Sequence, residues 1–153
     1  MKDNGYYVGF IGKYGVGNYL PQKAFDYWRG LAGQGTYYQK DKDGNPRHLT
    51  GLISEQIDEF LANRDETKPF CLSVSFKSPH TESEQDPFPF DKKYSFMYED
   101  EFFDKPETFG ENYYRLFPES FRKDGKWENE GYVRFKNRYG TDEEYQSSVK
   151  GYY

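Results

Sequence analysis

The chain has 153 residues, a net charge of −5 at pH 7 and a mean hydropathy of −1.11, with 35% hydrophobic and 21% aromatic residues. This length suits about one domain, but aliphatic residues are too scarce for an ordinary aliphatic core. The single cysteine excludes an internal disulfide, no apolar run is long enough to span a membrane, and the acidic balance argues against a general nucleic-acid-binding protein.

The first predicted element is a strand over residues 7–12, a short β-prone run that ends in glycine. A glycine-rich loop that contains Lys13 follows it at residues 12–18. Glycines let backbone amides approach an anion and a lysine adds a point charge, so the loop suits a phosphate or a sulfate. Tyr14 stands where a nucleotide P-loop needs serine or threonine, which excludes that motif. A tight turn with a surface lysine is the alternative interpretation.

A helix is predicted over residues 49–64, because apolar residues recur there at every third or fourth position and line one face. Residues 65–69 break this pattern and end in proline. Residues 70–76 are short, β-prone and mostly apolar, which predicts a buried strand. The order strand, loop, helix, strand indicates an α/β layer arrangement. The apolar face of the helix is formed by Leu49, Leu52, Ile53, Ile57, Phe60 and Leu61.

Two candidate site residues, Lys77 and His80, follow the second predicted strand. Ligands of α/β sheets bind beyond the carboxyl ends of the strands, so both side chains are placed for anion binding and acid–base chemistry. The alternative is an exposed loop histidine. His48 lies just before the predicted helix, and we expect it to help start that helix or to be exposed, and not to take part in the site. We expect Cys71, inside the strand, to act as a small hydrophobic residue and not as a nucleophile.

The second half of the chain, residues 80–153, is nearly devoid of aliphatic side chains. Such a stretch is either disordered, as its low hydropathy suggests, or structured around its aromatic residues. We favour the structured alternative, because disordered segments are poor in aromatic residues and this one is rich in them. The leucine, isoleucine and valine residues of this half are Leu116, Val133 and Val149.

Local patterns in this half predict two loops and a helix. We expect the acidic residues 99–104 to form a solvated loop instead of a metal site, and residues 125–127 to form a turn instead of part of a sugar platform. A helix is predicted to begin at Thr141, because Thr141 and Glu144 have the spacing of a capping box, and to run through Val149.

Taken in series, the motifs of the first half resemble the sulfatase family, the arylsulfatase-like branch of the alkaline-phosphatase-like superfamily. The resemblance covers about residues 3–80. It implies an α/β fold, a partial alkaline-phosphatase-like sandwich with a mixed β-sheet and flanking helices, followed by a long aromatic-rich loop region. The chain would be an internal fragment of one catalytic domain. The matching segments are residues 5–17, 25–27, 48–53, 68–70 and 79–80.

This resemblance also implies a division of the chain and a function. Residues 1–80 would form the sheet and helix core with the active-site loops, residues 81–140 a loop-rich excursion, and residues 141–153 the start of a helix. The parent protein would be a sulfuric ester hydrolase that is periplasmic or secreted. Its substrate would be a sulfated small molecule or glycan, and the aromatic, polar composition of residues 81–140 suits a sugar cleft.

Three site residues follow from the resemblance. Lys13 would bind the sulfate oxygens, and His80 would stabilise or protonate the leaving oxygen. Lys77 is a second candidate contact to the substrate. The chemistry agrees with these roles, because fixed cations stabilise an anionic sulfuryl group and a leaving alkoxide needs a proton or a positive charge.

The chain also departs from the family pattern. The family loop carries a histidine two residues after the lysine, and Gly15 stands there instead. The formylglycine nucleophile of the family arises within Cys-x-Pro-x-Arg or a serine variant, and Cys71 does not qualify because Ser73 and Ser75 replace the proline and the arginine. The family's calcium ligands have no counterpart in this sequence, so calcium is expected in the parent protein and no cofactor in this chain. We therefore expect these residues alone to hydrolyse nothing.

Three alternatives to the sulfatase interpretation stay open. One is a phosphate or phosphonate ester hydrolase of the same superfamily, which would need a serine or threonine nucleophile and zinc ligands upstream. Another is a non-catalytic module that binds acidic glycans through Lys13, Lys77 and nearby aromatic residues. The third is a chain that does not fold alone, because an open sheet with unpaired edges is a liability.

Overall fold

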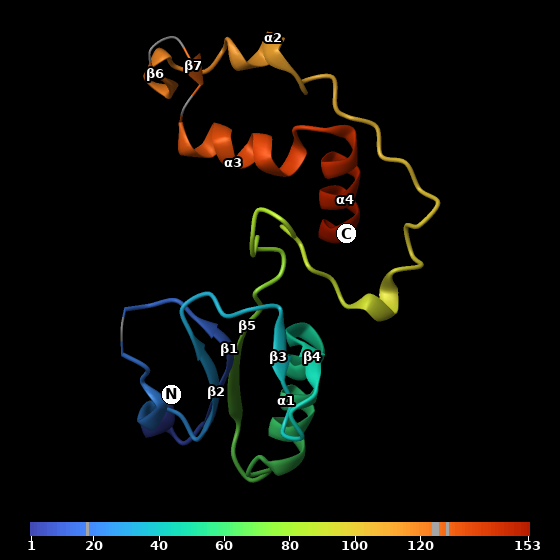
Figure 1. Ribbon diagram of the computed structural model, residues 1–153. Coiled ribbons are helices and arrows are strands. Elements are labelled where there is room, and N and C mark those ends of the chain that lie inside the picture. The colour runs from blue at the N-terminus through green and yellow to red at the C-terminus, as the bar shows by residue number, and fades with distance from the viewer. Residues whose placement is uncertain (18, 124–125, 128) are drawn as a thin grey trace. The chain divides into compact units, whose positions relative to one another are not determined.

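A computed structural model describes residues 1–17, 19–123, 126–127 and 129–153. The chain divides into two compact units, Met1–His80 and Thr81–Tyr153 (Figure 1). Among the described residues, the first unit holds the three-stranded sheet and the longest helix, and the second holds three further helices, one of them a single turn, and several short elements.

The sheet of the first unit has three parallel strands among the described residues. Strand β1 (Tyr7–Tyr14) lies between β2 (Tyr27–Ala32) and β5 (Phe70–Ser75) (Figure 1). The register places Gly12 of β1 opposite Ser75 of β5. Because the strands are parallel, their carboxyl ends lie at one edge of the sheet, and the segments that follow β1 and β5 leave from that edge.

Helix α1 (Leu49–Asn63) packs on one face of this sheet and matches the helix predicted from the sequence within one residue. Its buried residues Ile53 and Phe60 are 1% and 0% exposed, and they pack with Ile11 of β1. Burying each such side chain contributes roughly 1.5–3 kcal/mol. The core is completed by partly buried Tyr7, Tyr27, Leu31, Ile57, Leu61, Leu72 and Val74.

Aromatic rings build the other face of the sheet, where Phe10 points because side chains alternate along a strand. The Phe10 ring stacks on Trp28 with centroids 5.0 Å apart, and Phe25 and Tyr14 lie 5.7 and 5.4 Å from Phe10. Such ring pairs contribute about 0.5–1.5 kcal/mol beyond their buried area. In this unit, aromatic rings therefore provide packing contacts that aliphatic side chains usually provide.

Short elements complete the first unit. The 3-10 turns are η1 (Lys2–Asn4) and η2 (Gln22–Ala24), and a hairpin of β3 (Tyr38–Lys40) and β4 (Pro46–His48) precedes α1. Asp26 ties the amino end of β1 to η1: its carboxylate accepts the Val8 amide at 2.9 Å and pairs with Lys2 at 2.9 Å. The hydrogen bond from Lys2, and then that from Val8, lower the pKa of Asp26.

The strand predictions need three corrections. Strand β1 continues to Tyr14, so Lys13 belongs to the strand and not to the following loop. Strand β5 is not buried: Phe70 is 45% exposed, because β5 has a neighbour only on its β1 side among the described residues. Strands β2, β3 and β4 were not predicted. In β2, Arg29 and Gly30 weaken the strand pattern, and pairing with β1 overrides that local preference.

The second unit contains two helices of ten and eleven residues, α3 (Glu130–Tyr139) and α4 (Asp142–Tyr152). The predicted capping box of α4 is confirmed: Thr141 Oγ1 accepts the Glu144 amide at 3.1 Å, and Glu144 accepts the Thr141 amide at 2.9 Å. Helix α3 was not predicted. Its sequence is mostly polar, and its start depends on the Asn129 side chain, which accepts the Gly131 amide at 2.8 Å. The shorter elements are η3 (Lys92–Tyr94), α2 (Glu111–Tyr114), η4 (Glu119–Phe121), β6 (Arg122–Lys123) and β7 (Lys126–Trp127).

Rings replace aliphatic side chains in the core of the second unit, as the structured alternative requires. Phe109 lies 5.5 Å from Phe135 and 5.4 Å from Tyr145, and Phe135 lies 5.2 Å from Tyr139. Burial raises the pKa of Tyr139. Of the predicted turn at residues 125–127, Lys126 and Trp127 instead form strand β7, and Gly125 lies outside the described residues. Within the described ranges, no helix has the length and apolar character needed to cross a membrane.

We predict that Gly12→Ala destabilises the first unit. Gly12 has φ +95°, a conformation that strains any residue with a Cβ, and a Cβ there would lie 2.1 Å from the Ser75 carbonyl oxygen. The expected loss is about 1–3 kcal/mol of unfolding free energy, measured by denaturant unfolding. Gly15→Ala is the matched control, because the nearest atom to its Cβ is 3.8 Å away. Equal unfolding midpoints for the two variants would contradict this account.

Candidate anion-binding site

The three predicted site residues belong to one edge of the sheet. Lys13 is the last but one residue of β1, and Lys77 and His80 follow the end of β5 at Ser75. Since β1 and β5 are adjacent and parallel in the register given above, all three leave the sheet at its carboxyl edge.

A four-residue turn at residues 77–80 carries Lys77 and His80. The His80 amide donates to the Lys77 carbonyl at 2.8 Å, and the Ser78–Pro79 peptide is cis. The Ser78 Oγ lies 3.4 Å from Thr50 Oγ1, in the first turn of α1. The 77–80 turn therefore holds Lys77 and His80 together beside the amino end of that helix.

Tyr37, which the sequence analysis did not identify as a site residue, contacts the 77–80 turn. Its side chain is 3% exposed, and its hydroxyl donates to the His80 carbonyl at 2.8 Å. The Lys77 Nζ lies 5.1 Å from the centroid of the Tyr37 ring, and the His48 ring stacks on that same ring with centroids 5.4 Å apart. No spacing rule separates Tyr37 from the other tyrosines, because its partners are up to 43 residues away in the chain.

Lys77 is a buried residue whose ammonium group has no carboxylate partner among the described residues. Lys77 is 4% exposed, and no Asp or Glu of the described ranges lies within 4.0 Å of its Nζ. Burying a charge is costly unless an opposite charge or a hydrogen-bonding group compensates it. The ring of Tyr37 compensates in part through a cation–π contact. A bound anion would supply the missing negative charge.

Helix α1 adds to the positive character of this edge. Its N-cap is His48, whose Nδ1 accepts the Thr50 amide at 3.4 Å, which confirms the prediction that His48 helps start the helix. The amino end of a helix carries a partial positive charge and favours anions. Two lysines, a helix start and a histidine that can donate a proton when charged suit a tetrahedral oxyanion with a leaving group.

Cys71 is not part of this arrangement. It is a free, half-buried cysteine near the amino end of β5, paired with Val8. At about 3.3 Å per residue, roughly 20 Å of extended chain separates it from Lys77. The structure thus gives Cys71 no role in chemistry at the carboxyl edge.

A calcium ion does not fit the described residues. Nowhere in the described ranges do three or more His, Cys, Asp or Glu side chains gather in a way that could hold a metal. The side chains at the carboxyl edge are ammonium and imidazole groups, whereas calcium takes oxygen ligands. The acidic residues 99–104 lie in a loop that is mostly exposed.

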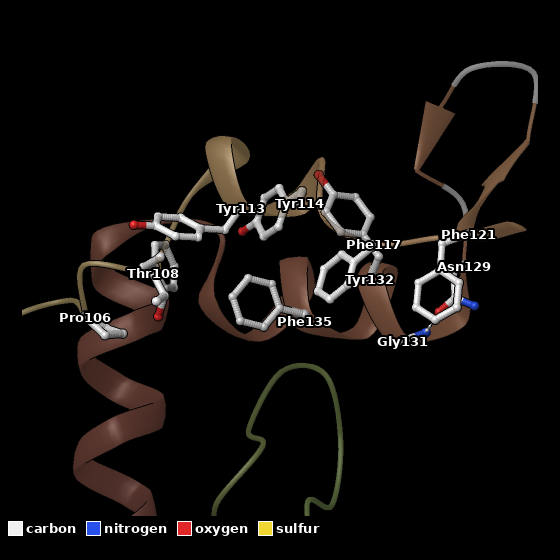
Figure 2. A pocket seen from close by; sticks show the side chains of 11 residues that line it. Pro106, Thr108, Tyr113, Tyr114, Phe117, Phe121, Asn129, Gly131, Tyr132 and Phe135 are labelled. Atoms are coloured by element: carbon white, nitrogen blue, oxygen red, sulfur yellow. Dashed lines mark hydrogen bonds between the residues drawn. The ribbon is translucent and has the colours of Figure 1, made fainter. Parts of the chain in front are cut away.

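The second unit contains a separate pocket of about 460 Å³ between α2 and α3 (Figure 2). Thr108 and Asn129 are its polar lining residues besides tyrosines, and the Asn129 oxygen is engaged as the cap of α3. In Figure 2 the rings of α2 lie opposite those of α3, with Tyr114 5.3 Å from Tyr132. The pocket is too apolar to hold an anion. Its aromatic lining consists of Phe109, Tyr113, Tyr114, Phe117, Phe121, Tyr132 and Phe135.

Comparison with known proteins adds three similarities. The Sulfatase family model matches residues 1–149. The N-acetylglucosamine-6-O-sulfatase of Bacteroides thetaiotaomicron is 34% identical over 89 residues, which cover 52% of this chain and 16% of that protein. The solved structure of BT4656 in complex with its substrate D-glucosamine-2-N,6-O-disulfate is 26% identical with a TM-score of 0.52, and the match covers 70% of this chain and 22% of that one. The chain thus spans less than a quarter of the length of either relative. The structural similarity also confirms the predicted α/β fold class.

We predict that Lys77→Met raises the unfolding free energy by about 1 kcal/mol, because methionine keeps the buried volume and removes a charge that has no carboxylate partner among the described residues. Denaturant unfolding measures the change. Lys23→Met, at an exposed position, is the control and should stay within about 0.5 kcal/mol of the unsubstituted chain. A clear loss of stability in Lys77→Met would mean that the ammonium group stabilises the fold without any anion.

Proposed function

This chain belongs to the sulfatase family, and from that premise we propose that its residues form the sulfate-binding edge of a sulfuric ester hydrolase. The observation that carries the proposal is the convergence of Lys13 and the 77–80 turn on the carboxyl edge of the sheet, with the buried Lys77 lacking a carboxylate partner among the described residues. The positive charge of this edge matches the negative charge of a sulfate ester.

Each cation has a distinct role in the proposal. The sulfuryl oxygens carry negative charge in the ground state and in the transition state, so the ammonium groups of Lys13 and Lys77 bind and orient them. The oxygen of the departing alcohol gains charge as its bond to sulfur breaks. His80, when protonated, donates a proton to that oxygen or stabilises its charge.

Two parts of the family chemistry are not assigned to this chain. The formylglycine nucleophile has no position here, because Cys71 lies outside the required motif and away from the carboxyl edge. Calcium belongs to the parent protein in this proposal, and no step is routed through it here, because the described residues do not fit it. A periplasmic or secreted location remains a prediction.

A sulfated amino sugar is the substrate class that we propose for the parent protein. Support comes from the two relatives, one an N-acetylglucosamine-6-O-sulfatase and the other bound to a disulfated glucosamine. The two matches cover 52% and 70% of this chain and only 16% and 22% of the relatives, so the sugar is proposed for the parent protein and not for this chain alone.

Binding without catalysis is the second candidate function. It is favoured by one observation: the sequence contains the cations that would hold a sulfate and no nucleophile motif that would cleave its ester. Sulfate-ester turnover by the parent protein separates the two candidates, because both predict that this chain alone binds sulfate without cleaving its ester.

We predict that the chain binds inorganic sulfate and that Lys13→Met weakens this binding about tenfold, since one charge-assisted hydrogen bond is lost. The measurement is a titration with sodium sulfate at constant ionic strength, followed by NMR shifts of the Lys77, Ser78 and His80 amides. Lys23→Met, which removes an exposed lysine outside the carboxyl edge, is the charge-matched control and should bind like the unsubstituted chain. Equal affinities for the two variants would refute a sulfate site at Lys13.

We also predict that the purified chain does not hydrolyse aryl sulfates, with or without calcium. The physical reason is the missing nucleophile: the cations can bind and stabilise charge, but none of them attacks sulfur. The assay follows release of a chromogenic phenol from its sulfate ester over hours. Calcium-dependent turnover above the rate of the buffer would overturn this prediction and would point to a nucleophile within these residues.

A further inference from the structure

We propose that Tyr37 is a positioning residue that holds Lys77 and His80 in the geometry for sulfate. This inference rests on the proposed function of the carboxyl edge. Tyr37 contacts both residues at once, through its hydroxyl to the His80 carbonyl at 2.8 Å and through its ring to the Lys77 ammonium at 5.1 Å.

The hydroxyl acts on the backbone of His80 and not on its imidazole. The acceptor is the His80 carbonyl oxygen, and the same residue donates its amide to the Lys77 carbonyl at 2.8 Å. The backbone from which the imidazole projects is thus fixed on both sides. This bond does not involve the imidazole nitrogens of His80.

The ring holds the Lys77 ammonium without neutralising it. A carboxylate at the same place would pair with Lys77 and compete with sulfate for the charge. An aromatic face attracts a cation through its quadrupole and keeps the full positive charge available. Since Lys77 is 4% exposed as a residue, its side chain has little freedom to leave this contact.

Tyr37 is itself fixed to the start of α1. Its backbone carbonyl accepts the Leu49 amide at 2.7 Å, and its ring stacks on His48, the N-cap, at 5.4 Å and 30°. With 3% of its surface exposed, it has little freedom to move. Tyr37 therefore connects the 77–80 turn to the start of α1. This connection keeps Lys77 and His80 in a fixed position relative to the amino end of the helix.

The test compares two substitutions of Tyr37 in the full 153-residue chain. Tyr37→Phe keeps the ring and removes the hydroxyl, and Tyr37→Leu removes both. We expect sulfate affinity to fall about threefold to tenfold in Tyr37→Phe, as for one lost hydrogen bond, and further in Tyr37→Leu. Tyr19→Phe, at a position that is 73% exposed, is the matched control and should leave the affinity unchanged.

Two further readouts separate positioning from a general structural role. The NMR signal of the His80 imidazole should shift in Tyr37→Phe at every pH, while denaturant unfolding should show a chain that is still folded. In a chain that already carries His80→Ala, Tyr37→Phe should weaken sulfate binding less than twofold, because the group that it positions is gone. A loss of the same size in both backgrounds would overturn the inference, and so would an unchanged affinity in Tyr37→Phe.

The outcomes also separate this inference from the proposed function. If the unsubstituted chain binds no sulfate, the proposed function fails, and the NMR signal of the His80 imidazole alone tests whether Tyr37 positions His80. A shift of that signal in Tyr37→Phe supports the positioning role, and an unchanged signal refutes it. If the chain binds sulfate through Lys13 and Tyr37→Phe binds it equally well, the sulfate site stands and the role of Tyr37 falls.

Discussion

The parallel pairing of β1 with β5 is the constraint on which the rest of this molecule depends. It sets Gly12 opposite Ser75 and so brings the end of the first strand beside the segment that carries the 77–80 turn. Only glycine allows the close approach at position 12, where φ is +95° and the Ser75 oxygen lies 2.1 Å from where a Cβ would be. Helix α1 then covers one face through Ile53 and Phe60, and its start reaches the same edge. Fold and site are therefore consequences of one register.

Local rules predicted the elements whose signals are local. Helix α1 follows from its apolar periodicity, and α4 from the capping box of Thr141, because both depend on residues within one or two turns. Strand β2 and helix α3 were missed, since β2 is defined by pairing with β1 and α3 by the cap at Asn129 and by ring contacts. The exposure of β5 depends on its neighbours in the sheet, which no pattern within residues 70–76 contains.

The candidate site likewise contains residues that the sequence could predict and one residue that it could not. Lys13, Lys77 and His80 could be picked out because each lies near the end of a predicted strand and because the family resemblance covers them. The roles that the resemblance gives them are still proposals. Tyr37 could not be found, since its hydrogen bond to His80 spans 43 residues and its ring contact to Lys77 depends on the folded 77–80 turn. The burial of Lys77, which makes an anion attractive there, is likewise a property of the fold.

The central claim is that the carboxyl edge of the sheet binds a sulfate group, and the most direct measurement is a crystal structure of the chain grown with selenate, a tetrahedral analogue of sulfate whose selenium is located by anomalous scattering. This account predicts a selenium peak within hydrogen-bonding reach of Lys13 and of the 77–80 turn, near the start of α1. Ordered crystals whose anomalous peaks all lie elsewhere, with Lys77 still buried against Tyr37, would contradict it.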